Sequence, residues 1–177
     1  MARTMLSQRS DRMLVEGYLR SRDERSFREL YRGHTPALYR LALQLCGSEA
    51  DAQDAIQDTW IRTCKALSTF QWKSSLRTWL TGVLINCVRE QSRKRNRHHE
   101  EQLPDDWPAT IAEPTGERMN LEGTIARLPD GYRHVLTLHD VEGYTHEEIS
   151  VLLDISVGTS KSQLHHARQA IKTLFRM

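Results

Sequence analysis

The sequence predicts an all-α protein made of two small helical domains joined by a flexible acidic linker. Apolar residues recur every three or four positions along most of the chain, and no segment alternates convincingly between apolar and polar residues. The stretch from His99 to Glu117 differs: it holds six acidic residues, three of the five prolines, and no lysine or arginine. Because proline breaks helices, we interpret this stretch as a linker. We therefore expect domains at residues 1–98 and 119–177, with the linker at 99–118.

The composition is typical of a soluble protein that stays in the cytoplasm. The 177 residues are 38% apolar and 27% charged, and the net charge of +2 is too small to indicate nucleic-acid binding by itself. No apolar run approaches the roughly 18 residues that a membrane span needs, and the start lacks the apolar segment of a secretory signal. Cys46, Cys64 and Cys87 form no Cys-x-x-Cys pair, so we expect buried thiols, no zinc site and no disulfide framework.

The first domain begins with two expected helical segments. One runs from Asp11 to about Arg22, and a second apolar stripe extends from Phe27 to Leu45. Pro36 lies inside this stripe and predicts a kink or a restart, because proline has no amide hydrogen to donate. Gly47 is expected to end the unit.

Two longer helices complete the first domain. Ser48 can cap a helix from Glu49 to Leu67, whose early acidic residues suit a helix N-terminus. A loop from Ser68 to Ser74 follows. The next helix starts near Ser75 and runs into the basic segment Arg93–Arg97.

The second domain is expected to start near Met119, to break at Leu128-Pro129, and to end in a helix, a tight turn and another helix. Thr145 and Glu148 fit a capping box for the first of these helices, and Ser156 can cap the second. No acidic residue follows Ile155, so the last helix is basic, as in proteins that present a helix to the DNA major groove. The alternative is a helical hairpin with a solvated face. The side chains expected to reach base edges or phosphates are Thr159, Lys161, Ser162, His165, His166, Arg168 and Lys172.

Two features of the first domain have more than one interpretation. The outer face of the helix that begins at Glu49 is acidic, which by itself indicates a solvated surface. In the following loop Phe70 and Trp72 flank Gln71, with Lys73 close by. Aromatic side chains beside cations suit the stacking of unpaired bases, at about 1–3 kcal/mol each. The same two aromatics could instead pin the loop to the core.

The basic helix end at Arg89, Arg93, Lys94, Arg95 and Arg97 indicates contact with phosphates, or else a charged terminus beside the acidic linker. No motif indicates an enzyme: the chain has no Gly-rich phosphate loop, no His-Glu-x-x-His and no nucleophile elbow. The eight histidines are scattered, so we expect no metal site and no cofactor.

Taken in order, these blocks resemble the extracytoplasmic-function (ECF, group IV) sigma factors of bacterial RNA polymerase over nearly the full length of the chain. Phe27–Tyr31 with Pro36 is similar to the opening helix of that family, and Asp51–Trp60 to its polymerase-binding helix. Phe70, Ser75–Leu80 and Asn86 are similar to the region of that family that recognises the −10 element. The family's −35 domain is matched by Leu128-Pro129, Gly143–Ile149 and Val157–Ser162.

The resemblance implies a non-catalytic subunit that binds core RNA polymerase, directs it to specific promoters and helps to melt the −10 element. It assigns contact with the polymerase β′ and β subunits to Asp51, Asp54, Gln57, Asp58 and Arg62. It assigns contact with the melted −10 strand to Phe70, Gln71, Trp72, Lys73, Ser74, Arg77, Asn86, Arg89, Arg93, Lys94 and Arg95. The last helix would lie in the −35 duplex, and the linker would run through the polymerase. The resemblance also implies an anti-sigma factor as partner, often membrane-attached, and no small-molecule substrate.

The chain departs from the family pattern at five positions of the second domain. Asp154 stands where glycine is usual, Ser156 where proline is common, and Ser160 where an apolar residue is usual. A left-handed turn tolerates Asp less well than Gly, whereas Ser156 can compensate by capping. Gln163 and His166 replace frequent arginines, so we expect weaker binding to phosphates around the −35 element.

Two other functions remain open from the sequence. A helix-turn-helix repressor or activator would use the first domain to dimerise or to sense a ligand, and would bind a palindromic operator. A pure protein-interaction module would act as an antagonist or a decoy. A sigma factor instead predicts a chain that binds promoter DNA poorly until the polymerase joins it.

Overall fold

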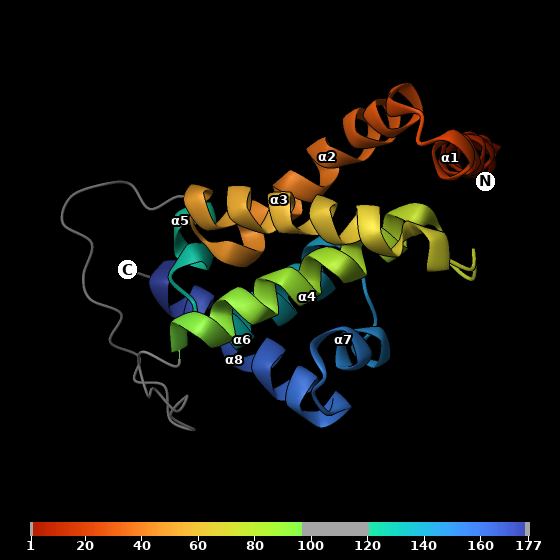
Figure 1. Cartoon of the computed structure of the whole chain (residues 1–177). Coiled ribbons are helices and arrows are strands. Elements are labelled where there is room, and N and C mark those ends of the chain that lie inside the picture. The colour runs from red at the N-terminus through yellow and green to blue at the C-terminus, as the bar shows by residue number, and fades with distance from the viewer. Residues whose placement is uncertain (1, 97–120, 176–177) are drawn as a thin grey trace.

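The computed structural model describes residues 2–96 and 121–175, and this part of the chain contains eight α-helices and no strand. The helices are α1 (Ala2–Ser21), α2 (Glu24–Cys46), α3 (Glu49–Ala66), α4 (Leu76–Asn96), α5 (Leu121–Ala126), α6 (Asp130–Leu136), α7 (His146–Leu153) and α8 (Val157–Phe175) (Figure 1). A 3-10 segment, η1 (Leu67–Thr69), follows α3, and a π-helical segment, η2 (Thr137–Val141), continues α6. The all-α prediction is confirmed. The predicted linker at 99–118 lies outside the described residues.

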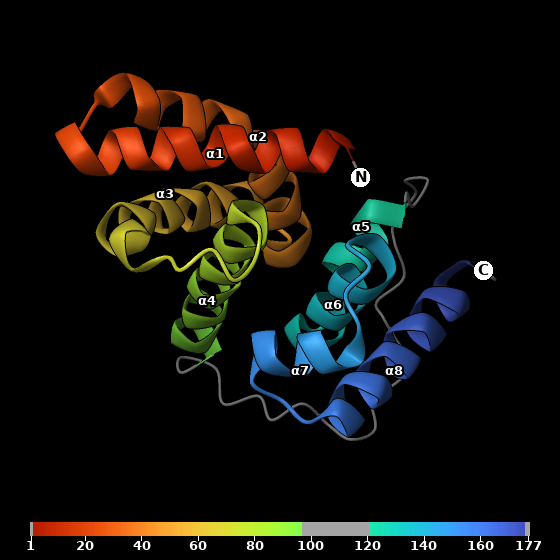
Figure 2. The same cartoon turned by 90° about the vertical axis from the view of Figure 1, so that its right-hand side faces the viewer.

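Helix α2 is longer and more continuous than predicted. Asp23 caps it through bonds from the amides of Arg25 and Ser26, and Gly47 ends it in the left-handed conformation, with φ of 73°. The helix passes through Pro36, so the predicted restart is wrong, although Figure 2 shows α2 bending along its length. The missing amide of Pro36 removes one helical hydrogen bond, and the buried residues on both sides hold the two parts together.

Helices α3 and α4 begin where the sequence predicts them. The hydroxyl of Ser48 accepts a bond of 3.2 Å from the amide of Asp51, and the hydroxyl of Ser75 accepts one of 3.0 Å from the amide of Thr78. Both helices pack with α2 around a shared core. Its fully buried side chains include Leu45, Leu67, Leu76, Leu80, Leu84 and Ile85. Cys46 and Cys87 are buried as predicted, whereas Cys64 is half-buried.

The predicted helix, turn and helix at the C-terminal end are present as α7 and α8. Thr145 and Glu148 form the expected capping box. Asp154 ends α7 in the left-handed conformation with φ of 55°, as its position in the turn suggested. The hydroxyl of Ser156 then accepts a bond of 2.9 Å from the amide of Thr159, which fixes the start of α8.

The two halves of the chain pack directly against each other. Figure 2 shows α7 beside α4, and α5 and α6 beside the C-terminal end of α2. One continuous set of buried apolar side chains includes Leu45 and Leu84 from the first half and Leu138 and Ile149 from the second. None of the helices in the described part of the chain is long and apolar enough to cross a lipid bilayer.

Candidate interfaces for protein and nucleic acid

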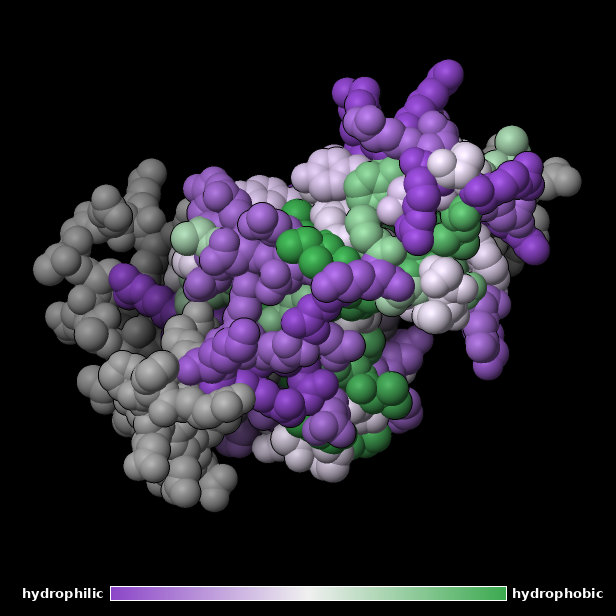
Figure 3. All heavy atoms as spheres, in the orientation of Figure 1, coloured by the Kyte–Doolittle hydropathy of each residue, from purple (hydrophilic) through white to green (hydrophobic). Residues whose placement is uncertain are grey.

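Helices α2 and α3 form an open groove with a volume of about 580 Å³. Its floor is aromatic: the ring of Trp60 lies 5.6 Å from that of Phe27 and 5.1 Å from that of Tyr31. Tyr31 and Ile61 keep 41% and 46% of their surface exposed, and Figure 3 shows apolar patches interrupting the hydrophilic surface over these helices. Exposed apolar surface inside a groove is typical of a protein-binding site.

Two buried polar atoms border this groove without a hydrogen-bond partner among the described residues. They are the hydroxyl oxygen of Thr35 and the indole nitrogen of Trp60, and both residues line the groove. Because an unsatisfied buried donor costs about 1–3 kcal/mol, an acceptor from a bound protein would relieve the cost at Trp60.

The predicted polymerase-binding residues of α3 fall into three environments. Gln57 lines the groove, and Asp54 shares its side of the helix and is exposed like it, while Asp58 is half-buried. Asp51 instead accepts a bond of 2.8 Å from the hydroxyl of Ser48 at the N-terminus of the helix. It faces the junction with the second half rather than the groove. The structure therefore places Gln57 in the groove with the exposed Asp54 one turn before it, whereas neither Asp58 nor Asp51 lines the groove.

Arg62, the fifth of these residues, is held by an ion pair within the first half. Two of its guanidinium nitrogens donate to the two carboxylate oxygens of Glu90 on α4, at 2.7 and 2.6 Å. The paired guanidinium lowers the pKa of Glu90, and the carboxylate raises the pKa of Arg62. Arg62 thus joins α3 to α4, and a contact with another protein would compete with this bond.

The aromatic residues of the 70–74 loop pack onto the protein itself. The ring of Phe70 lies 4.7 Å from that of Trp72 and 5.1 Å from that of Trp79 on α4, and Arg12 of α1 lies over Trp72 at 5.9 Å. This geometry matches the interpretation that the aromatics pin the loop. The remaining loop candidates, Gln71, Lys73 and Ser74, are exposed. Trp72 adopts a positive φ of 58°, which is rare for a bulky side chain.

The basic side of α4 is partly occupied by the second half of the chain. Arg89 donates to the carbonyl of Leu152 at 3.3 Å and pairs with Asp154 at 3.4 Å, so its side chain is only 16% exposed. Arg77 lies 3.8 Å from Glu142 and is more open. The other candidates with described side chains on this helix, Asn86, Arg93 and Lys94, are exposed or nearly so, and the side chain of Arg95 lies outside the described part.

Helix α8 presents all seven residues that the sequence selects for −35 recognition. Each is exposed, while Ser160, Leu164 and Ala167 face the core. The ring of His166 stacks on Tyr132 at 5.8 Å. The exposed set consists of Thr159, Lys161, Ser162, His165, His166, Arg168 and Lys172.

Arg168 differs from its neighbours because a carboxylate already holds it. Its guanidinium donates two hydrogen bonds, of 3.0 and 2.6 Å, to Asp140 in η2. These bonds lower the pKa of Asp140 and raise the pKa of Arg168. Sequence reasoning missed Asp140, since no local pattern connects it to a residue 28 positions later.

A second polar connection inside the helix-turn-helix was also missed. Ser160 is completely buried, and its hydroxyl lies 2.8 Å from Nδ1 of His146 on α7. The ring of His139 lies 4.6 Å from that of His146. The sequence signal was Ser160 itself, a polar residue where an apolar one is usual. Its hydrogen-bond partner, His146, could be identified only from the fold. Within the described residues no three histidine, cysteine or acidic side chains are grouped so as to hold a metal ion.

Comparisons with known proteins match both halves of the chain. The family description "Sigma-70 region 2" matches residues 30–98, and "Sigma-70, region 4" matches residues 118–171. The chain is 30% identical over 144 residues to the ECF RNA polymerase sigma factor EcfG of Rhodopseudomonas palustris, covering 78% of this chain and 79% of that protein. The chain belongs to the ECF family of RNA polymerase sigma factors.

A second relative supports the same membership, and two solved structures show the same fold. The ECF sigma factor SigE of Mycolicibacterium smegmatis is 33% identical over 156 residues, and the match spans 83% of this sigma factor but 60% of that longer relative. The sigma factor RpoE of Bartonella quintana, solved with the anti-sigma factor NepR, superposes with a TM-score of 0.63 at 24% identity, covering 85% and 97% of the two chains. CnrH, solved with the cytosolic domain of CnrY, gives 0.60 at 22% identity, covering 94% and 97%.

Proposed function

We propose that this protein is an alternative sigma factor that binds core RNA polymerase, directs it to specific promoters and helps to melt the −10 element. It has no catalytic activity of its own. The observation that carries this function is the groove between α2 and α3, lined by Gln57 with the exposed Asp54 one turn before it, on a chain that also exposes a basic recognition helix. A repressor needs the helix alone, whereas a sigma factor needs both surfaces.

We propose a division of labour between residues 1–98 and 119–177, with residues 99–118 as the acidic connection. The first unit would bind the polymerase β′ subunit through the side of α3 that carries Asp54 and Gln57. It would hold the melted −10 strand along the exposed loop residues and α4. The second unit would place α8 in the −35 duplex, with Lys161 and Lys172 on phosphates and Thr159 nearest the start of the helix.

The partners follow from this function. They are core RNA polymerase, promoter DNA, and an anti-sigma factor, which many relatives have as a membrane-attached protein. The polymerase and the chromosome lie in the cytoplasm, so we propose a cytoplasmic location. The groove that would receive the polymerase is also the surface that an antagonist would have to cover.

The experiment that tests this function compares DNA binding with and without polymerase. Footprinting on a promoter duplex should give protection with purified core enzyme plus the chain, and none with the chain alone at the same concentration. The reason is avidity: two weak contacts reinforce each other only when the polymerase holds them at the right separation. A specific footprint from the chain alone, together with a dimer in sedimentation, would support the repressor instead.

A further inference from the structure

The imidazole of His166 is held in place, although it lies on the exposed side of α8. Its ring stacks on the ring of Tyr132 from α6, with 5.8 Å between the centroids and 19° between the planes. The ring of His165 meets it edge to face at 5.6 Å and 79°. Both separations lie in the range of favourable aromatic pairs, about 4.5–7 Å. His166 therefore has a preferred orientation, in contrast to the long and flexible side chains of Lys161 and Lys172 on the same helix.

Tyr132 is a rigid support for this ring because the protein encloses it. Only 6% of its surface is exposed, and it belongs to the continuous apolar core. The glycine before it allows α8 to approach closely: a Cβ added to Gly131 would stand 2.8 Å from Nε2 of Gln163. A contact as close as this one fixes the register of α6 against α8 beside the stacked pair.

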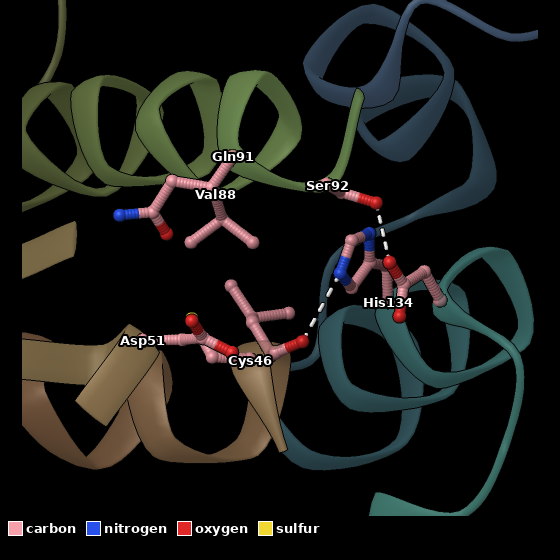
Figure 4. A pocket seen from close by; sticks show the side chains of 8 residues that line it. Cys46, Asp51, Val88, Gln91, Ser92 and His134 are labelled. Atoms are coloured by element: carbon pink, nitrogen blue, oxygen red, sulfur yellow. Dashed lines mark hydrogen bonds between the residues drawn. The ribbon is translucent and has the colours of Figure 1, made fainter. Parts of the chain in front are cut away.

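The two residues after Tyr132 hold the backbone of α6 by contacts that do not involve α8. Nη1 of Arg133 donates to the carbonyl of Leu128 at 2.8 Å, in the turn that precedes α6. Nε2 of His134 lies 3.1 Å from the carbonyl of Leu45, and Figure 4 shows His134 where α2, α4 and α6 meet. The backbone that carries Tyr132 is thus held from both sides of the helix, and the position of its ring follows from that.

A fixed imidazole suits the reading of a base, because it offers an N–H group in a defined direction. In the major groove, adenine and guanine both present N7 as an acceptor, whereas the acceptor of thymine lies beside a methyl group. A side chain that is already ordered also loses less conformational freedom on binding. A flexible ammonium group on the same helix suits a phosphate, which carries no sequence information.

We propose that Tyr132 is a positioning residue for DNA recognition: it holds the imidazole of His166 so that its N–H group donates to N7 of a purine in the −35 duplex. The inference rests on the proposed function for the DNA, whereas the stacking is a property of the free chain. Two tasks on α8 are then separate. His166 selects the base, and Lys161 supplies an affinity for phosphate that is the same for every sequence.

Nuclear magnetic resonance of the full chain without polymerase tests the stacking. Protons above an aromatic ring resonate upfield, so the ring protons of His166 should move downfield in Tyr132→Leu, which keeps an apolar side chain in the core but has no ring. Tyr132→Phe keeps the ring, removes only the hydroxyl and is the matched control. Circular dichroism checks that both variants are helical. A His166 signal that is the same in all three proteins would overturn the stacked pair.

Selection of bound duplexes from a library with a randomised −35 segment tests the readout in holoenzyme. The wild type and Tyr132→Phe should enrich purines over pyrimidines at one position by roughly fivefold, the factor expected from one hydrogen bond. His166→Ala, which leaves the core intact, and Tyr132→Leu should lose this preference and keep the preferences at the other positions. Lys161→Ala is the comparison that should weaken binding without changing any preference.

A 7-deaza purine, which has a carbon in place of N7, identifies the contact. At the selected position it should weaken the binding of wild-type holoenzyme by the same factor and leave that of His166→Ala unchanged. A purine preference that survives in Tyr132→Leu would overturn the positioning role, and an equal loss at every position in His166→Ala would mean a phosphate contact instead. A chain that forms no holoenzyme would refute the proposed function and the readout together, whereas the stacking is decided on the free chain.

Discussion

Arg62 on α3 and Glu90 on α4 are joined by two hydrogen bonds of 2.7 and 2.6 Å, each nitrogen facing its own carboxylate oxygen. This two-pronged geometry is the strongest that an arginine and a carboxylate can form. The side chains are 40% and 46% exposed, so solvent screens much of the attraction. The pair therefore contributes modestly to stability. It also holds α3, the helix with the proposed polymerase contacts, against α4.

We expect Arg62→Ala and Glu90→Ala to lower the free energy of unfolding, with a coupling between them of about 0.2–1 kcal/mol, as for other partly exposed pairs. Urea unfolding of the two single variants and the double variant measures this coupling, and Lys65→Ala on the same helix is the control. If Arg62→Ala left stability unchanged but abolished polymerase binding, Arg62 would be a direct contact instead.

The helix-turn-helix should lose stability in mild acid because of His146. Burial lowers the pKa of this imidazole below its usual 6.5, and the nearby His139 lowers it further. Between 6.5 and the lower folded value the unfolded chain binds more protons than the folded one, so stability falls as the pH drops through this window.

Removing the imidazole should remove that part of the pH dependence. Urea unfolding at pH 7.5 and 5.5 should show His146→Asn losing less stability than the wild type, by at most about 1.4 kcal/mol per pH unit for one proton. His165→Asn, an exposed position on α8, is the control and should behave like the wild type. An unchanged pH dependence in His146→Asn would show that other groups cause the acid sensitivity.

The cations of α8 should differ in their effect on DNA binding. Lys161 is exposed, whereas Arg168 is already paired with Asp140. Each phosphate contact contributes about 0.9 to the slope of log affinity against log salt. In holoenzyme bound to a promoter duplex, Lys161→Ala should make that slope shallower by about 0.9. Arg168→Ala should make it shallower by less.

Releasing Arg168 provides the complementary test. Asp140→Asn removes the carboxylate that neutralises the guanidinium, so the slope should become steeper than in the wild type. Equal losses for Lys161→Ala and Arg168→Ala, with no effect of Asp140→Asn, would show that the ion pair does not compete with phosphate.

Local features of the fold could be predicted from the sequence because their causes lie within a few residues. The capping roles of Ser48 and Thr145 depend on hydroxyls and amides three positions apart. The left-handed turn at Asp154 could be placed for the same reason. At Pro36 the sequence left a kink or a restart open, and the helix continues because packing on both sides outweighs the loss of one backbone hydrogen bond.

Relationships between distant residues could not be predicted. Nothing near Arg62 or Arg168 in the sequence identifies Glu90 or Asp140 as a partner, and each pairing removes a cation that looked free for binding. The same holds for the contact between the two halves: Arg133 carried no motif, yet it reaches the end of α2. A charge pattern shows which side chains can bind, and only the tertiary fold shows which are already occupied.

The most direct test of the central claim is whether the purified chain co-elutes with bacterial core RNA polymerase on gel filtration. The wild type should co-elute, and Asp54→Ala/Asp58→Ala should not, because the exposed Asp54 and the half-buried Asp58 are the two carboxylates proposed to contact the polymerase. Glu16→Ala/Glu29→Ala removes two acidic side chains whose ion pairs, with Arg12 and Arg25, are exposed, and this control should bind like the wild type. A wild-type chain that elutes apart from the polymerase, as a dimer that shifts duplex DNA by itself, would contradict the account.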